Sequence, residues 1–230
     1  MKDFKHISGR SVFLDTLRGF TVILMIIFHF SFDLDFFGLV DIDIIHAPFW
    51  YFFPRLIVFL FLFAVGIGLT LAHKDGIKWK PFFKRLALLV FWAIIISVAT
   101  FFFFRDNWIY FGTLHAISVV SVMSLPFIKR PWVALVVGLG LFIPSITMDQ
   151  TIPWWHLPHP SWDYISPFPW VGASLLGIFA AHKGLHLIHY PKNKLVKSLN
   201  YLGQHSLVIY LIHQPILFGL LALFVKLKRS

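Results

Sequence analysis

The sequence predicts an all-α protein: a polytopic bundle of about seven transmembrane helices that forms one domain over residues 1–230. The 230 residues are 58% hydrophobic with a mean hydropathy of +0.79, and only 13% of them are charged. The chain also contains 28 Phe, far more than a soluble domain of this size carries. Apolar stretches of about 20 residues recur along it, which is the length a helix needs to cross a bilayer.

Seven apolar stretches are expected to form the membrane spans. They are residues 14–33, 53–73, 86–104, 109–127, 132–148, 168–183 and 206–225. The basic segment 1–13 is not expected to be a signal peptide, because the stretch after it contains Asp15 and Arg18 and has no small-residue cleavage site. Cys is absent, which excludes disulfides, thiolate metal sites and iron–sulfur clusters.

Basic residues predict an integral inner (plasma) membrane protein with a cytoplasmic N-terminus. In that orientation fifteen of the twenty Lys and Arg residues lie on or near the inner side, as the positive-inside rule requires. They are Lys2, Lys5, Arg10, Arg18, Lys74, Lys78, Lys80, Lys84, Arg85, Lys129, Arg130, Lys183, Lys192, Lys194 and Lys197. Lys226, Lys228 and Arg229 disagree, since they would lie outside. The net charge of +10 therefore reflects topology, and no nucleic-acid partner is expected.

The first apolar stretch carries ionisable side chains into the membrane, where they are costly and usually mark a function. Asp15, Arg18, His29 and Asp33 fall within a helical sector about 60° wide, so they form one polar stripe that faces inward. A rise of about 16 Å separates Arg18 from His29, which places Arg18 near the cytoplasmic surface and His29 toward the outside. The structural alternative is that Asp15 pairs with Arg18 while His29 bonds to a neighbouring helix.

Two later stretches add polar groups at membrane depth. His115, in the fourth stretch, is expected toward the outer side. Tyr210, His213 and Gln214, in the last stretch, are expected toward the inner side, where Pro215 frees a backbone carbonyl.

Histidines at these positions could serve two kinds of metal site. A b-type haem needs paired axial His, but His213 is expected lower in the membrane than His29 and His115, which argues against it. The run of His182, His186 and His189 has helical spacing, but it lacks acidic or Cys partners and is interpreted as an interfacial face. No metal is therefore expected.

Two long loops are expected on the outer side, at residues 35–52 and 149–167. The first holds His46, and the second is rich in Trp, His and Asp. Such a loop suits stacking on a sugar, although Trp also gathers at membrane interfaces in general.

Short motifs along the chain occur in a recognisable order. They are Leu-Asp-Thr-Leu-Arg-Gly-Phe at 14–20 with Leu-Met at 24–25 and His29, the stretch 59–71 with Gly66, Phe-Gly-Thr-Leu-His-Ala-Ile at 111–117, Pro-Phe-Pro-Trp-Val-Gly at 167–172 with Leu-Gly at 176–177, and 206–215. In this order they resemble the catalytic region of heparan-alpha-glucosaminide N-acetyltransferase and its short bacterial relatives. The Asp-x-x-Arg-Gly opening is shared with a wider group of transmembrane acyltransferases.

The resemblance implies an acetyl-CoA-dependent N- or O-acetyltransferase embedded in membrane lipid. It would move an acetyl group from cytoplasmic acetyl-CoA to an amino sugar, another glycan or a lipid-linked sugar on the outer face. The donor phosphates would lie near Arg18 and the inner basic loops. The polar groups expected along the donor path are Asp15, Arg18, Tyr210, His213 and Gln214.

A histidine is expected to act as general base toward the acceptor. His46 matches the neighbourhood of the family's proposed catalytic His, while His29 stands where some members carry Asn; His29 is preferred for its depth. Asp33 is expected to orient His29, and His115 and Tyr210 to donate hydrogen bonds to the oxyanion. Direct attack and a transient acetyl-imidazole both stay open.

A membrane transporter or a structural subunit without enzymatic activity is the alternative, since either would also keep buried charges. Binding of the acetyl donor distinguishes these classes from a transferase. No internal repeat is present in the sequence, so an inverted-repeat transporter gains no support.

Overall fold

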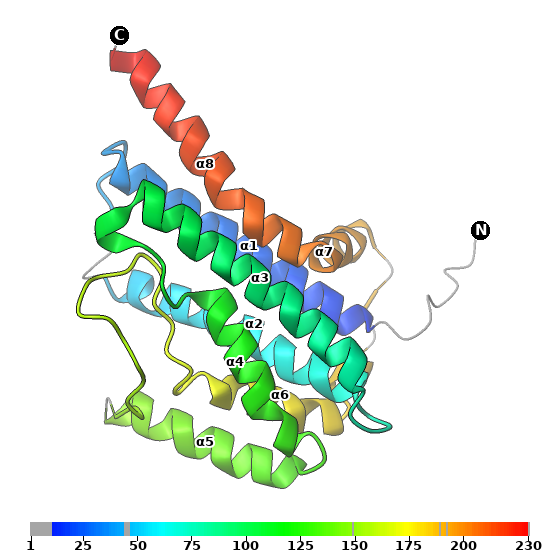
Figure 1. Cartoon of the computed structure of the whole chain (residues 1–230). Coiled ribbons are helices and arrows are strands. Elements are labelled where there is room, and N and C mark those ends of the chain that lie inside the picture. Colours follow the sequence, from blue (N-terminus) through cyan, green and yellow to red (C-terminus); the bar gives the residue numbers. More distant parts are fainter. Residues whose placement is uncertain (1–10, 44–46, 149, 189, 192, 230) are drawn as a thin grey trace. The chain divides into compact units, whose positions relative to one another are not determined.

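The computed structural model describes residues 11–43, 47–148, 150–188, 190–191 and 193–229, and the whole chain is drawn in Figure 1. Within these ranges the chain forms helices and no strands. The α-helices are α1 (Val12–Phe36), α2 (Pro48–Ala72), α3 (Trp79–Phe103), α4 (Thr113–Ser124), α5 (Pro131–Thr147), α6 (Val171–His182), α7 (Lys194–Gln204) and α8 (Ser206–Arg229). Short 3₁₀ turns are η1 (Arg105–Asn107), η2 (Leu125–Phe127) and η3 (Leu185–Leu187).

The helical class is confirmed, but about seven spans are not. Among the described residues, four helices are long and apolar enough to cross a membrane: α1, α2, α3 and α8. The helices α4, α5 and α6 are apolar but shorter. The fourth predicted stretch begins in non-helical chain up to Gly112, and the sixth begins in the turn around Pro169, so each yields a helix of 12 residues. Such a helix rises about 18 Å, short of a hydrocarbon core of about 30 Å.

The chain divides into two compact units. Unit 1 comprises residues up to Phe61 together with those from His186 onward, and unit 2 comprises Leu62–Leu185. Helix α2 continues from one unit into the other. That the units form one domain stays a prediction.

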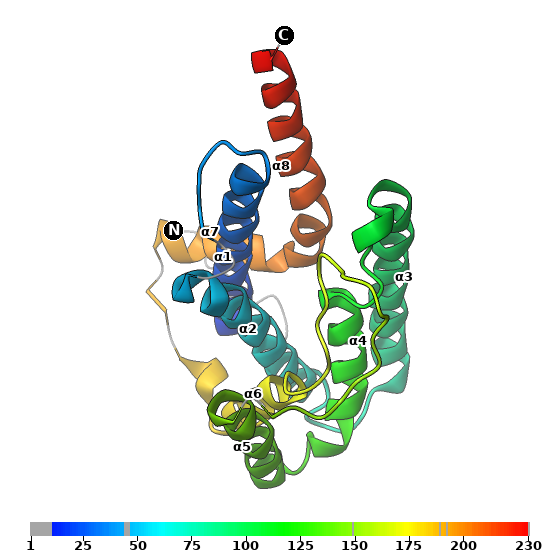
Figure 2. The same ribbon diagram turned by 90° about the vertical axis from the view of Figure 1, so that its left-hand side faces the viewer.

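In unit 1, α1 packs against α7 and α8, and Figure 2 shows this group from the side. Backbones of α1 and α7 approach very closely: a Cβ atom on Gly19 would lie 1.9 Å from the Leu199 carbonyl oxygen. A Cβ atom on Gly203 would lie 1.7 Å from the carbonyl oxygen of Asp15. Asn200 Nδ2 donates a 2.6 Å hydrogen bond to Thr16 Oγ1 at the same crossing. Small residues are thus required where α7 crosses the start of α1.

Helices α1 and α8 run in the same direction. Tyr210 packs on the cluster that contains Met25, and the ring of His213 contacts that of His29. Further along, the rings of Phe36 and Phe218 lie 5.5 Å apart between centroids. Because residue numbers rise together along both helices, the two are parallel.

In unit 2, α4 packs against α3 and α6, and α5 packs against α6. The second half of α2 lies against α6, where a Cβ atom on Gly66 would come within 1.8 Å of the Ser174 carbonyl oxygen. Ser124 Oγ donates to Ser174 Oγ at 2.9 Å, a buried hydrogen bond between α4 and α6. Unit 2 therefore has its own closely packed interior.

Candidate active site

A cluster of polar side chains lies where α1 and α8 meet in unit 1. Helix α1 supplies His29 and Asp33, which are one helical turn apart. Helix α8 supplies Tyr210, His213 and Gln214, which share one face at helical spacing. Apolar residues, including Val22 and Met25, pack against α8 one turn earlier. The cluster is thus a polar patch within an otherwise apolar helix contact.

The first pair in the cluster is Asp33 and Gln214. Gln214 Nε2 donates a 2.8 Å hydrogen bond to Asp33 Oδ1, and the Asp33 side chain is fully buried at 0% exposure. Asp33 Oδ2 and Gln214 Oε1 are also buried, and neither has a hydrogen-bond partner among the described residues. A buried polar atom without a partner costs about 1–3 kcal/mol.

The second pair is His29 and His213. Their ring centroids lie 4.8 Å apart at an interplanar angle of 65°, so the rings meet edge to face. His213 Nδ1 lies 2.8 Å from the Tyr210 carbonyl oxygen and 3.2 Å from that of Ile209. Carbonyl oxygens only accept, so we assign the ring proton to Nδ1, which makes Nε2 of the neutral ring an acceptor. That Nε2 atom is buried and has no partner in the described part of the chain.

The three partnerless atoms of the cluster share one chemical property. Asp33 Oδ2, Gln214 Oε1 and His213 Nε2 are all hydrogen-bond acceptors. Their common complement is a group rich in N–H or O–H donors, for which an amine is better suited than a carbonyl or a phosphate. His29 is half-buried and makes no hydrogen bond within the described ranges, so its ring nitrogens remain available.

The expected depth of His213 was wrong. The sequence places it below His29, whereas the two rings are in contact. Helix α8 starts beside the middle of α1, because Ile209 and Tyr210 pack on Val22 and Met25 rather than near the start of α1. The expectation took no account of α7, which precedes α8 and packs against α1. Two touching rings also leave no space for a porphyrin between them.

Two other expectations about the base concern Asp33 and His46. Asp33 bonds to Gln214, and it has no hydrogen bond to His29 within the described ranges, so the orienting role stays a prediction. His46 lies outside the described residues.

Near the start of α1, Asp15 and Arg18 come together. Arg18 Nη1 lies 3.9 Å from Asp15 Oδ1, Asp15 is buried, and about a fifth of the Arg18 side chain is exposed. This is the pairing expected under the structural alternative. It also holds the guanidinium beside the crossing with α7.

His115 belongs to unit 2, at the start of α4. Its Nδ1 accepts a hydrogen bond from the Gly112 amide at 3.1 Å, so the neutral ring carries its proton on Nε2. Nε2 lies 3.2 Å from Ser97 Oγ, and Ser97 Oγ donates to the Ile109 carbonyl oxygen at 2.6 Å. Both ring nitrogens are therefore engaged: Nδ1 caps the start of α4, and Nε2 joins α4 to α3. Donation to an oxyanion stays a prediction for His115, and it would require the bond to Ser97 to break.

A model of the family described as heparan-alpha-glucosaminide N-acetyltransferase, catalytic, matches residues 10–215. The chain belongs to this family. The match confirms the resemblance predicted from the motifs and indicates a membrane protein of an acetyltransferase family. No curated protein and no solved structure matches the chain.

The residues of the opening motif hold α1 and α7 together in this family member. Within Asp-Thr-Leu-Arg-Gly, Thr16 accepts from Asn200 and Gly19 admits the backbone of α7. Asp15 lies against Gly203 and pairs with Arg18. The motif thus fixes α7 on α1 and holds one guanidinium at that crossing.

Sequence reasoning missed the role of Asp163 in this family member. Asp163 Oδ2 accepts from the Thr113 amide at 2.8 Å and from Thr113 Oγ1 at 3.0 Å, so it caps α4 from the loop before α6. Burial raises the pKa of Asp163, and the hydrogen bonds from Thr113 oppose that rise. The sequence around Thr113 does not predict this cap, because the capping residue lies 50 positions further along the chain.

Proposed function

We propose that this protein transfers an acetyl group from cytoplasmic acetyl-CoA to an amino group of a glycan acceptor, such as an amino sugar or a lipid-linked amino sugar, on the outer face. The observation that carries the proposal is the α1–α8 polar cluster in a chain that belongs to an acetyltransferase family. Ionisable side chains within a membrane helix cost free energy, and they usually mark a functional site.

The chemistry of the cluster favours an amine over a hydroxyl acceptor. Asp33 Oδ2, Gln214 Oε1 and His213 Nε2 can each accept a hydrogen bond, and a primary amine has more N–H groups to offer than a hydroxyl has O–H. We propose that these three atoms orient the acceptor nitrogen beside His29. An O-linked acceptor would leave at least two of them without partners.

A histidine serves as general base in this proposal. His29 takes a proton from the acceptor amine as the amine nitrogen attacks the thioester carbonyl carbon. The C–S bond then breaks, and the leaving thiolate takes the proton from His29, which returns to its neutral form. His46 is the alternative base. Tyr210 and His115 are the two predicted oxyanion donors, and donation by His115 would require its Nε2 proton to leave Ser97.

The acetyl donor is proposed to enter from the cytoplasmic end of α1. Arg18 presents a planar fork of N–H donors that fits phosphate, and it lies beside α7, whose Lys194 and Lys197 are exposed. Asp15 holds the guanidinium in place. About 16 Å separate this turn from His29, a distance that an extended pantetheine arm can cover.

The parallel course of α1 and α8 supports seven spans. Two parallel helices that both cross the membrane do so in the same sense, so the number of crossings from α1 to α8 must be odd. The four long helices alone give an even number. Because α4 and α6 are too short to span alone, we propose that they cross together with the apolar non-helical residues before them, and that α5 crosses as well. The N-terminus then lies on the cytoplasmic side of an inner (plasma) membrane.

Calorimetric binding of acetyl-CoA to the detergent-purified full chain tests the donor. Arg18→Ala is expected to weaken binding by about 10-fold to 100-fold, the worth of charge-assisted hydrogen bonds to a phosphate. Arg18→Lys should recover only part, because Lys lacks the planar fork. Bound acetyl-CoA should also raise the melting temperature of the wild type.

Arg55→Ala is the matched control, since Arg55 donates to the Tyr51 carbonyl oxygen within the first turns of α2. It should leave acetyl-CoA binding unchanged. If the wild type binds no acetyl-CoA, the donor is wrong and a transporter or structural subunit is favoured. If Arg18→Ala and Arg55→Ala weaken acetyl-CoA binding equally, the phosphates do not lie at Arg18.

A further inference from the structure

A strongly positive surface surrounds the turn between α2 and α3 in unit 2. It consists of five exposed cations within twelve residues, and we refer to it as the α2–α3 basic surface. Its members are Lys74, Lys78, Lys80, Lys84 and Arg85. Asp75 is the single acid in this stretch, and none of the five cations forms an ion pair within the described part of the chain.

The turn that carries this surface is firmly folded. The His73 amide donates to the Leu69 carbonyl oxygen at 3.0 Å, and the Gly76 amide donates to that of His73 at 3.0 Å. The Lys78 amide donates to His73 Nδ1 at 3.1 Å. Gly76 has φ +126°, a conformation that side chains other than glycine's rarely adopt. The cations are therefore presented by a fixed backbone.

Exposed aromatic side chains lie among the cations at the start of α3, and exposed apolar side chains continue beyond them along the helix. Trp79 and Phe83 are 53% and 56% exposed, and their rings stack with centroids 5.8 Å apart. Further along α3, large apolar side chains are exposed, among them Phe91 and Ile94. A helix start that mixes cations with aromatic rings, followed by apolar surface, matches the order in which a phospholipid presents its headgroup and interface and then its acyl chains.

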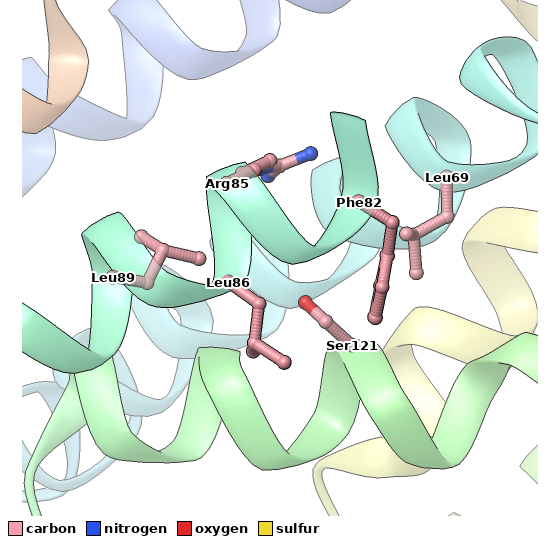
Figure 3. Close-up of a pocket in the computed structure, with 6 residues that line it drawn as sticks. All are labelled: Leu69, Phe82, Arg85, Leu86, Leu89 and Ser121. Atoms are coloured by element: carbon pink, nitrogen blue, oxygen red, sulfur yellow. The ribbon is translucent and has the colours of Figure 1, made fainter. Parts of the chain in front are cut away.

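The inner side of the same helix offers the cations no counter-charge. A small crevice beneath Arg85 is lined by Leu69, Phe82, Leu86, Leu89 and Ser121. Figure 3 shows Phe82 and Leu86 pointing from α3 toward the helix that carries Ser121. The crevice therefore supplies no negative charge to Arg85, whose guanidinium remains able to bind an anion from outside the unit.

We propose that the α2–α3 basic surface binds the headgroup of an anionic phospholipid, whose acyl chains lie along the exposed face of α3. The proposal does not depend on acetyl transfer. Free phosphate would satisfy the cations alone, whereas a lipid also covers Trp79, Phe83 and the apolar face beyond them. Clusters of four or more Lys and Arg beside a membrane helix attract anionic lipid by about 1 kcal/mol per cation.

Native mass spectrometry of the full chain with phosphatidylglycerol or phosphatidylcholine tests the proposal. The wild type is expected to prefer phosphatidylglycerol, and the triple variant Lys80→Gln, Lys84→Gln, Arg85→Gln to lose affinity for it by on the order of a hundredfold. The control removes three cations outside the surface: Arg105→Gln, Lys226→Gln, Lys228→Gln. It should keep the preference.

Three results would overturn the proposal. They are equal affinity of the wild type for the two lipids, equal loss in the control, and displacement of phosphatidylglycerol by acetyl-CoA, which would assign the surface to the donor phosphates. Melting in detergent micelles establishes that the triple variant is folded. If it is not, the single variants Lys80→Gln and Lys84→Gln take its place, each with an expected loss of about fivefold.

Discussion

The α1–α8 polar cluster of unit 1 and the hydrogen-bond network at the start of α4 in unit 2 use the same kinds of side chain in opposite ways. Around α4, Asp163 caps Thr113, and His115 joins the Gly112 amide to Ser97. In the α1–α8 cluster, Asp33 and His213 each keep one buried acceptor atom without a partner in the described ranges.

This difference separates a structural network from a candidate binding site. Buried polar groups in folded proteins are nearly always satisfied, so each exception requires an explanation. The bonds around α4 have a structural role, since they cap the start of α4 and join it to α3 and to the loop before α6. The α1–α8 cluster holds acceptors that a ligand could satisfy, which is why we assign the amine to it.

The largest expected effect follows from replacing one histidine in each region. His29→Ala should lower the rate of acetyl transfer by about 10²-fold to 10⁴-fold, the usual contribution of a general base. His115→Ala should lower the melting temperature, because it leaves the Gly112 amide without its acceptor, but should leave kcat of the folded fraction within a few fold of the wild type. Steady-state kinetics in detergent, corrected for folded protein, measures both.

If His115→Ala loses acetyl transfer while His29→Ala keeps it, the catalytic histidine lies in unit 2. If His29→Ala keeps its activity and His46→Ala loses it, the base is His46, and the α1–α8 cluster would serve only to bind the acceptor.

Much of the fold could be predicted from the sequence, because apolar stretches report on helices directly. Each of the seven predicted stretches overlaps one α-helix over most of its length, and the Asp-x-x-Arg-Gly opening pointed to the family. Helix ends were less predictable: Gly112 and Pro169 lie inside apolar stretches, yet the helices begin only after them. Hydropathy does not record where a backbone turns.

The candidate site was only partly predictable. The stripe of Asp15, Arg18, His29 and Asp33 follows from helical periodicity, since it requires a single helix. The pairing of His29 with His213 and of Asp33 with Gln214 depends on the offset between two helices about 180 residues apart. That offset is set by the packing of α7 and α8 on α1, and no local pattern encodes it.

The next prediction concerns stability in the two regions. The double variant Asp33→Val, Gln214→Leu removes both buried polar partners at once, so its free energy of unfolding should stay within about 1 kcal/mol of the wild type or rise. Acetyl transfer should be lost, since two of the three acceptors for the amine are gone. Melting in detergent and activity are measured on the same preparation.

Asp163→Leu is the matched comparison in unit 2. It removes one partner and leaves the Thr113 amide and hydroxyl unsatisfied, so a loss of about 1–3 kcal/mol is expected. Strong destabilisation by the double variant, equal to that of Asp163→Leu, would show that the Asp33–Gln214 bond is structural and would remove the distinction between the two regions.

The smallest expected effect is a pH dependence that belongs to unit 2. Burial lowers the pKa of His73, and the nearby charges of Lys78 and Arg85 lower it further. The unfolded chain therefore binds the proton more readily, so stability is present above a pH of about 6.5 and falls as the pH drops below it. Protonation of Nδ1 also removes the acceptor of the Lys78 amide.

His73→Gln should flatten this dependence, because a neutral side chain does not titrate. Melting temperatures between pH 5 and 8 of the wild type and the variant give the comparison, with His205→Gln, an exposed histidine after α7, as the control. A wild-type slope that survives in His73→Gln would place the acid sensitivity elsewhere, and the histidines of the α1–α8 cluster would then be the groups to replace.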